Sequence, residues 1–396
     1  MVAFRFNFID IFRAPRLAFS AKKIWVQLRA LALALVLYNL GAYGAFAASG
    51  ADVYRLWGAY YLFPPVPFGV AAPALNAVGY ILWGLGATAF VVAFSLGMTA
   101  VAKITVEQLR GNDFFSRREA GNFVRHHWRA VIFAPVALAV AAAVLFACGL
   151  LVGLIGKIPW FGEIFASLTV VLLYLGALVF LFLAFAFYVS YWLAPAFVAT
   201  TGDDTFETAF EVFATLSGQP WRFILYEAFL KWLVIGAGAL FAVVSFAALK
   251  IAFWALYVPM GLKAATIFNA AWRVMPPCLR GACASACPAG AWFNGACPPL
   301  WGNGEVFLPL PWSQAVAATF VSLGLLIILG VVCAYALNVV TVGQTVIYVI
   351  LRKKKDDENL LEMFDEELEQ AMLEVKAEEA VAADGASSEA STPPPA

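Results

Sequence analysis

Long apolar stretches alternate with short polar ones along the whole chain. Six apolar stretches reach the roughly 20 residues that a helix needs to cross a bilayer, and they cover residues 24–48, 74–102, 128–156, 164–200, 221–249 and 312–351. Helix-breaking sequences separate them, such as "PPVPFGVAAP" from Pro64 and "GKIPWFG" from Gly156. The pattern predicts an all-α, polytopic membrane protein with about six transmembrane helices, whose membrane domain covers residues 24–351.

Two stretches leave alternatives open. Residues 251–262 follow Lys250 and form another apolar run, which is a short extra span, a re-entrant segment or an interfacial helix. The first span ends in Ala45-Phe46-Ala47, which resembles a signal-peptidase site. However, basic residues extend to Arg29, and the apolar run of 30–48 is long enough to span a membrane. We therefore expect an uncleaved first helix, with a cleaved signal as the alternative.

Positive charge is distributed unevenly, although the formal net charge is zero and 63% of the residues are hydrophobic. The N-terminal segment through Arg29, the 103–129 and 201–222 connections and the start of the tail contain 17 Lys and Arg residues, against six in the other connections. Because positive charge is retained on the cytoplasmic side, this bias predicts two cytoplasmic termini and an outer loop at 250–311. The zero net charge provides no basic field for nucleic acid.

Two segments on the predicted cytoplasmic side resemble each other. Each begins with Gly-Asn/Asp-Asp, at Gly111 and Gly202, continues as an amphipathic helix and ends in Trp-Arg at the start of a span. Residues 1–23 form a looser third copy that leads to Trp25. We expect each glycine to end the incoming helix, the following Asp to cap the next one, and the tryptophans to lie at headgroup level. The sequence thus predicts three hairpin-like repeats with cytoplasmic amphipathic elbow helices.

The stretch "LAPAFVATTGDDTFETAFEVFATLSGQPWRFILYEAF" from Leu193 adds a family resemblance. Its Pro-terminated span, small-residue helix and Gly-x-Pro-Trp-Arg entry into the next span resemble uncharacterised bacterial multi-pass membrane proteins. More distantly, it is similar to the membrane domain of glycerophosphodiester phosphodiesterases. The resemblance covers chiefly residues 103–232. It implies a location in the bacterial cytoplasmic (inner) membrane and brings no catalytic residues, because the soluble phosphodiesterase domain is absent from this sequence.

Most cysteines of the chain lie in one Gly- and Pro-rich connection, at Cys278, Cys283, Cys287 and Cys297. Because the predicted orientation places this connection outside the cytoplasm, where disulfides persist, we predict two disulfides with three possible pairings. A metal site of four thiolates is the alternative. "CASACP" resembles part of a ferredoxin motif, but the preceding gap of four residues departs from that motif. Cys148 and Cys333 lie inside spans, and we predict buried, inert thiols there.

Few polar side chains within the spans could carry chemistry. Glu227 and Lys231 lie four residues apart in the fifth span, in the order that favours a helical ion pair. An intramembrane ion pair is by default a functional candidate. The two residues follow Trp221 closely, however, so we predict a structural pair near the interface. Other intramembrane amides are predicted to form interhelical hydrogen bonds, and these are Asn39, Asn76, Asn338 and Gln344.

The sequence predicts neither a catalytic site nor a cofactor. Its only histidines, His126 and His127, are adjacent, so a helix points them about 100° apart and away from a shared metal. No motif for a catalytic nucleophile, a phosphate loop or a dinucleotide occurs. We therefore expect a non-enzymatic integral membrane protein that acts as a scaffold or complex subunit. A transporter or channel for a small solute or lipid is the alternative, since internal repeats also occur in transporters.

The tail at 352–396 is acidic and predicted to be cytoplasmic, helical at first and then disordered by composition. Its helical part has an apolar face made of Leu360, Leu361, Phe364, Leu368, Met372 and Val375. This face predicts either a solvated helix or a docking helix for a protein partner. Membrane lipids are the other predicted partners, because so much of the chain is apolar.

Overall fold

The computed structural model describes residues 6–68, 73–112, 114–202, 205–276 and 311–356. Within these ranges the chain forms helices and connecting loops and contains no strand. Six helices are long and apolar enough to cross a membrane, and they are α2 (Ala21–Ala48), α4 (Ala77–Arg110), α5 (Arg117–Ile155), α7 (Val170–Thr201), α9 (Pro220–Met260) and α12 (Trp312–Asp356). The predicted all-α, multi-pass membrane fold is confirmed.

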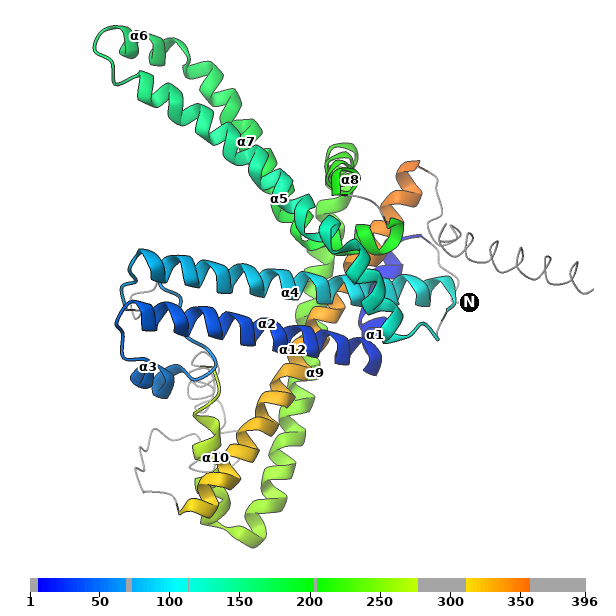
Figure 1. The fold of residues 1–396 in the computed structure, drawn as a ribbon. Coiled ribbons are helices and arrows are strands. Elements are labelled where there is room, and N and C mark those ends of the chain that lie inside the picture. The colour runs from blue at the N-terminus through cyan, green and yellow to red at the C-terminus, as the bar shows by residue number, and fades with distance from the viewer. Residues whose placement is uncertain (1–5, 69–72, 113, 203–204, 277–310, 357–396) are drawn as a thin grey trace, which may run out of the picture.

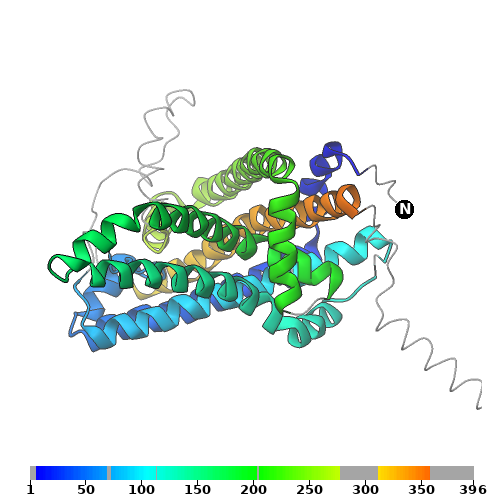
Figure 2. The same cartoon turned by 90° about the horizontal axis from the view of Figure 1, so that it is seen from above.

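The six long helices pair into three hairpins, α2–α4, α5–α7 and α9–α12, which meet at one end and diverge toward the other (Figure 1). In the perpendicular view the hairpins run roughly side by side (Figure 2). We call the meeting point the basic end, because it carries Lys103, Arg110, Arg117, Arg222 and Arg352. The opposite, loop end carries the short helices α3 (Val53–Tyr60), α6 (Phe161–Leu168) and α10 (Leu262–Trp272).

The two repeated glycines end helices as predicted. Gly111 follows α4 with a φ of 98°, and Gly202 follows α7 with a φ of 74°. This left-handed conformation costs glycine little, since it has no Cβ. The predicted Asp cap is wrong for α5, however. Ser116 caps this helix by accepting a hydrogen bond from the Glu119 amide at 3.3 Å, and Glu119 closes a capping box in return.

The predicted elbow helices take three different forms. The elbow before α9 is a separate helix, α8 (Thr205–Gly218), whereas the elbow before α5 is continuous with the span itself. Residues 1–23, expected to form one amphipathic helix, contain a 3-10 helix, η1 (Phe8–Arg13), and a short α1 (Ala14–Ala18). Phe19 then leaves the helical conformation before α2 begins. After each elbow, the tryptophan at the start of the following span is exposed, and these residues are Trp25, Trp128 and Trp221.

The apolar run at 251–262 is none of the three predicted alternatives. It mainly extends the fifth span, because α9 continues to Met260 and ends only where Gly261 turns the backbone with a φ of 56°. The chain then reverses into α10, and Ala271 of this helix packs with Met275, in the turn after it, against Leu325 of α12. Pro259 lies in the last turn of α9, where its missing N–H does not stop the helix before Gly261.

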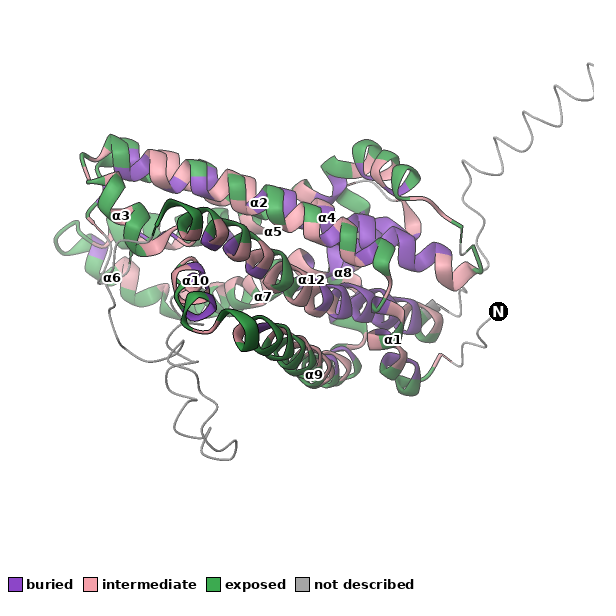
Figure 3. Ribbon diagram, turned by 90° about the horizontal axis from the view of Figure 1, so that it is seen from below, coloured by how far each residue is buried: buried purple, intermediate pink, exposed green. Residues whose placement is uncertain are grey.

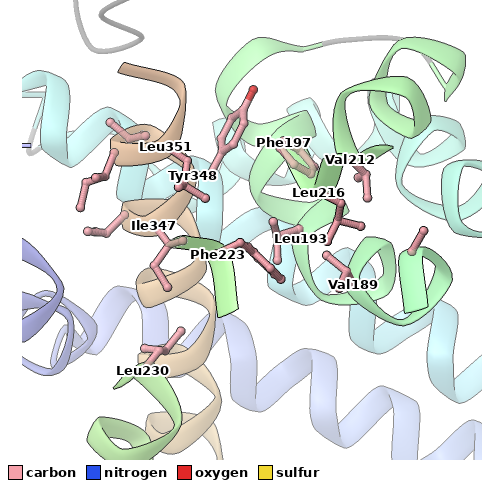
Figure 4. Close-up of a cluster of buried hydrophobic side chains, with 14 of the residues drawn as sticks. Val189, Leu193, Phe197, Val212, Leu216, Phe223, Leu230, Ile347, Tyr348 and Leu351 are labelled. Atoms are coloured by element: carbon pink, nitrogen blue, oxygen red, sulfur yellow. The ribbon is translucent and has the colours of Figure 1, made fainter. Parts of the chain in front are cut away.

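Buried residues concentrate at the basic end, while the helices toward the loop end expose most of their side chains (Figure 3). In the most apolar stretch of each span, 50% of the residues are buried in α4 but only 11% in α5, 6% in α7 and none in α9. The main core joins α7, α8, α9 and α12 (Figure 4). There the ring of Phe197 packs edge-on against Tyr348, with centroids 4.2 Å apart.

The helices of the α2–α4 hairpin approach each other closely, and small residues make that approach possible. The backbones of Gly41 and Gly86 touch, so a Cβ added to Gly86 would lie 2.7 Å from the Gly41 Cα. Gly97 packs in the same way against the Ala30 side chain. Small residues at helix interfaces allow extensive van der Waals contact within a bilayer, where no hydrophobic effect draws helices together.

Candidate functional site

A cavity of about 480 Å³ lies between α7, α9 and α12 on the basic half of the bundle. Nearly all of its wall is apolar or aromatic, and the exceptions are the charged and amide groups of Glu227, Lys231 and Gln344. A mostly apolar cavity with a few convergent polar groups is the usual form of a ligand site. This cavity is therefore the strongest candidate for a functional site among the described residues.

Helix geometry places the polar groups together. Glu227 and Lys231 lie one turn apart on α9, about 10 and 16 Å along the helix from its first residue, Pro220, at 1.5 Å per residue. Gln344 reaches the same cavity from α12. The Lys231 ammonium group acts electrostatically on the Glu227 carboxyl group. The sequence-predicted polar pair thus lies at a cavity wall, and the prediction that it is only structural stays untested.

Two oxygens of residues at the polar end of the cavity have no hydrogen-bond partner among the described residues. These are Oε1 of Glu227 and Oε1 of Gln344, each of which is buried from solvent. Gln344 as a residue is only 3% exposed. Burying an oxygen without a hydrogen-bond donor lowers the stability by on the order of 1–3 kcal/mol. A donor that binds to the oxygen would remove that penalty. Glu227 and Gln344, which both line the cavity, therefore each leave one acceptor oxygen unpaired among the described residues.

The cavity opens sideways, toward the region that the bilayer would occupy. Several apolar side chains in its wall are strongly exposed, among them Tyr188 at 51%, Ile224 at 45% and Ile235 at 62%. The Lys231 side chain is exposed as well. A ligand could therefore enter from the membrane, between α7 and α9, and its apolar part would remain against these side chains.

The four intramembrane amides that we expected to bridge helices have different roles. Asn39 donates to Leu35 and, at 3.1 Å, to Leu62 in the connection after α3. Asn76 caps α4 and donates to Ala48 at 2.9 Å, so it closes the α2–α4 hairpin. Gln344 lines the cavity between α7, α9 and α12, and its Oε1 has no hydrogen-bond partner among the described residues. For Asn338 the prediction is wrong in the part of the chain that the structure describes, because both of its amide atoms lie buried there without a hydrogen-bond partner.

A second polar cluster, which the sequence analysis missed, lies at the basic end of α4. Glu107 is 3.4 Å from Lys103 and 3.3 Å from Arg110, and all three side chains are at most 12% exposed. Lys103 also lies 4.5 Å above the ring of Phe123, and Arg110 donates to the Thr200 carbonyl at 3.5 Å. The cluster thus ties α4 to α5 and α7. The i, i+4 spacing of Lys103 and Glu107 was a visible signal for it.

Another charged contact joins the end of α12 to the elbow helix α8. Arg352 forms an ion pair with Glu211, and Lys354 donates to the Tyr226 hydroxyl on α9 at 3.0 Å. Both partners of the ion pair are largely buried. The positive residues that predicted the orientation are therefore also structural contacts at the basic end.

The thiols and histidines contribute no metal site in the part of the chain that the structure describes. His126 and His127 each contact the carbonyl four residues earlier in α5. The prediction that Cys148 and Cys333 are buried is wrong, because both thiols are free and exposed on apolar helix faces. Hydrophobic thiols can face lipid as readily as a core. The predicted disulfide residues Cys278, Cys283, Cys287 and Cys297 lie outside the described residues, as does the tail beyond residue 356.

Comparisons of the chain with protein-family models, curated proteins and solved structures found no match. The resemblance to the membrane domain of glycerophosphodiester phosphodiesterases therefore stays a prediction.

Proposed function

We propose that this multi-pass membrane protein is a non-enzymatic scaffold or complex subunit of the bacterial cytoplasmic membrane. The observation that carries the proposal is an uncovered face on α5 that contains Gly149 and Gly153. A Cβ on either glycine would meet nothing within 4 Å. Glycines four residues apart on a spanning helix form the close-packing motif through which transmembrane helices associate.

The distribution of packing also supports a partner. The hairpins diverge away from the basic end, and the most apolar stretches of α5, α7 and α9 have almost no buried residues. Lipid tails are as apolar as these faces, so lipid alone could cover them. The glycine pair on α5 favours a second helix at this face. Without side chains on the two glycines, another helix can make close backbone contact with α5, whereas lipid tails make no comparable contact.

Photo-crosslinking tests this proposal. With a photoreactive amino acid at Leu150, between the two glycines and 56% exposed, we expect a discrete protein adduct from native membranes, identified by mass spectrometry. The variants Gly149→Leu and Gly153→Leu should lose the adduct, because each leucine fills the contact surface. Gly176→Leu on α7 is the matched control, since its Cβ also meets nothing within 4 Å but it has no glycine partner one turn away.

An adduct of twice the chain mass would identify a second copy as the partner. If only lipids react, or if the Gly149→Leu adduct equals that of the unchanged protein, the scaffold proposal fails. Circular dichroism and elution volume of each variant establish that its fold is intact.

We further propose that the basic end faces the cytoplasm, supported by the Lys and Arg residues collected there. Single cysteines at two exposed sites test this in whole cells of a strain whose protein lacks the native cysteines. Lys157→Cys, in the turn before α6, should react with a membrane-impermeant reagent, and Asn112→Cys, after α4, should be protected. Labelling of the residue-112 site with protection of the residue-157 site would reverse the orientation.

Transport of a small solute or lipid is the second candidate, and the cavity with Glu227, Lys231 and Gln344 is the observation that favours it. The repeats alone do not, because the described spans contain no broken helix at mid-membrane of the kind that binds substrates in transporters. A flux that disappears in the double variant Glu227→Gln, Lys231→Met, while the fold and abundance persist, would replace the scaffold proposal with this one.

A further inference from the structure

We infer that the cavity between α7, α9 and α12 binds one phospholipid of zwitterionic type, with a primary ammonium group in its headgroup. The ammonium would meet Glu227 and Gln344, the phosphate would meet Lys231, and the acyl chains would follow the apolar wall. This inference is independent of the scaffold proposal, because it concerns a different face of the molecule.

Two buried acceptor oxygens indicate an ammonium group in the ligand. Glu227 and Gln344 line one cavity, and Oε1 of each is buried without a hydrogen-bond partner among the described residues. A primary ammonium group offers three N–H donors and a positive charge, so it satisfies both oxygens and balances the carboxylate. A quaternary ammonium group has no N–H donor and would leave the two oxygens unsatisfied.

The phosphate part follows from Lys231. This residue lies one helical turn beyond Glu227, about 6 Å along the axis, and it lines the cavity while remaining exposed. Its neighbour Trp232 is 75% exposed, so the surroundings are those of a membrane-facing surface. A cation at this place is costly in hydrocarbon unless an anion accompanies it. The phosphate of a lipid held by Glu227 supplies that anion.

The combination of charges selects the lipid class. One acid and one base, a turn apart, match a headgroup that carries one positive and one negative group. A lipid with only a phosphate would place its headgroup near the Glu227 carboxylate without a compensating cation. The apolar wall accounts for the rest of the molecule, because Phe185, Tyr188 and Ile235 line the cavity and are all exposed toward the bilayer side.

The test uses the full chain, purified in detergent and offered equal amounts of three phospholipids with identical acyl chains. Their headgroups are ethanolamine, choline and glycerol. Native mass spectrometry counts the bound lipid, and thermal unfolding reports any stabilisation. We expect one retained ethanolamine lipid per chain and about tenfold weaker retention of the other two, the ratio for one charge-assisted hydrogen bond.

Variants separate the cavity from general lipid binding. Glu227→Gln and Lys231→Met should each lower the retention of ethanolamine lipid about tenfold, and Lys231→Arg should restore most of it. Lys250→Met is the matched control, because Lys250 is an exposed lysine on the same helix outside the cavity. If Glu227→Gln does not fold, Lys231 carries the test, since its side chain is exposed and is not part of the packed core.

Equal retention of the three lipids would overturn the inference. So would a Lys231→Met variant that retains ethanolamine lipid as well as Lys250→Met does. Neither result bears on the crosslinking at α5, so failure of this inference and failure of the scaffold proposal are distinguishable.

Discussion

Replacement of Gly86 by leucine is expected to separate α2 from α4 and to prevent the hairpin from packing. A Cβ at this position would lie 2.7 Å from the Cα of Gly41, a backbone atom that cannot move without moving α2. Even small overpacking in a core costs about 1–3 kcal/mol, and a leucine adds three further carbons beyond the Cβ. We expect a loss in unfolding free energy at or above the upper end of that range.

Gly84 provides the matched control for this prediction. It lies two residues earlier on the same helix, and a Cβ there would meet nothing within 4 Å. Gly84→Leu should therefore leave stability within about 0.5 kcal/mol of the unchanged protein. Unfolding in mixed micelles of increasing SDS content, followed by circular dichroism, measures both variants. Equal midpoints for Gly86→Leu and Gly84→Leu would contradict the close approach of the two helices.

The second large effect is expected at Glu107. Its carboxylate lies within 3.4 Å of Lys103 and Arg110, and the three side chains are nearly buried. Glu107→Gln removes the negative charge and leaves two cations in a poorly solvated place without this counter-charge. Removing one partner of a buried ion pair costs about 3–5 kcal/mol. We expect a loss of that order in the unfolding free energy, measured by the same SDS titration.

Glu163→Gln on α6 makes the same chemical change at an exposed position, and it should leave the unfolding midpoint unchanged. A stronger test adds Lys103→Met to Glu107→Gln, since removal of one cation should restore part of the lost stability. If the double variant is no more stable than Glu107→Gln, the pairing of Lys103 with Glu107 contributes little.

The positions and ends of the helices were largely predictable from the sequence. The six spans follow from the length of apolar stretches, because an uncharged run of this length satisfies its backbone hydrogen bonds in a bilayer only as a helix. Gly111 and Gly202 were predictable as helix ends because glycine, which has no Cβ, adopts the left-handed conformation that ends a helix. Two local predictions were wrong. Phe19 interrupts the helix that we expected over residues 1–23, and Ser116 caps α5 in place of the expected aspartate.

The identity of the buried faces was not predictable. The predictions for Cys148 and Cys333 were wrong, because a spanning helix is apolar on the side that meets lipid as well as on the side that meets protein. For the same reason, no local sequence pattern shows that Gly86 contacts another helix whereas Gly84 does not. The candidate cavity required Gln344 of α12 to meet Glu227 of α9, residues more than a hundred positions apart.

The sequence by itself therefore determined the number of spans, the hairpin repeats and the concentration of positive charge at one end. Each depends on hydrophobicity, backbone hydrogen bonding or glycine conformation within a short stretch of chain. The tertiary structure alone decided which glycines touch, where the acidic group between Lys103 and Arg110 is buried, and how Glu227, Lys231 and Gln344 come to line one cavity. The reason is physical: helix–helix contact in a bilayer depends on shape and polar pairing between distant segments, and hydrophobicity is nearly equal on all sides of these helices.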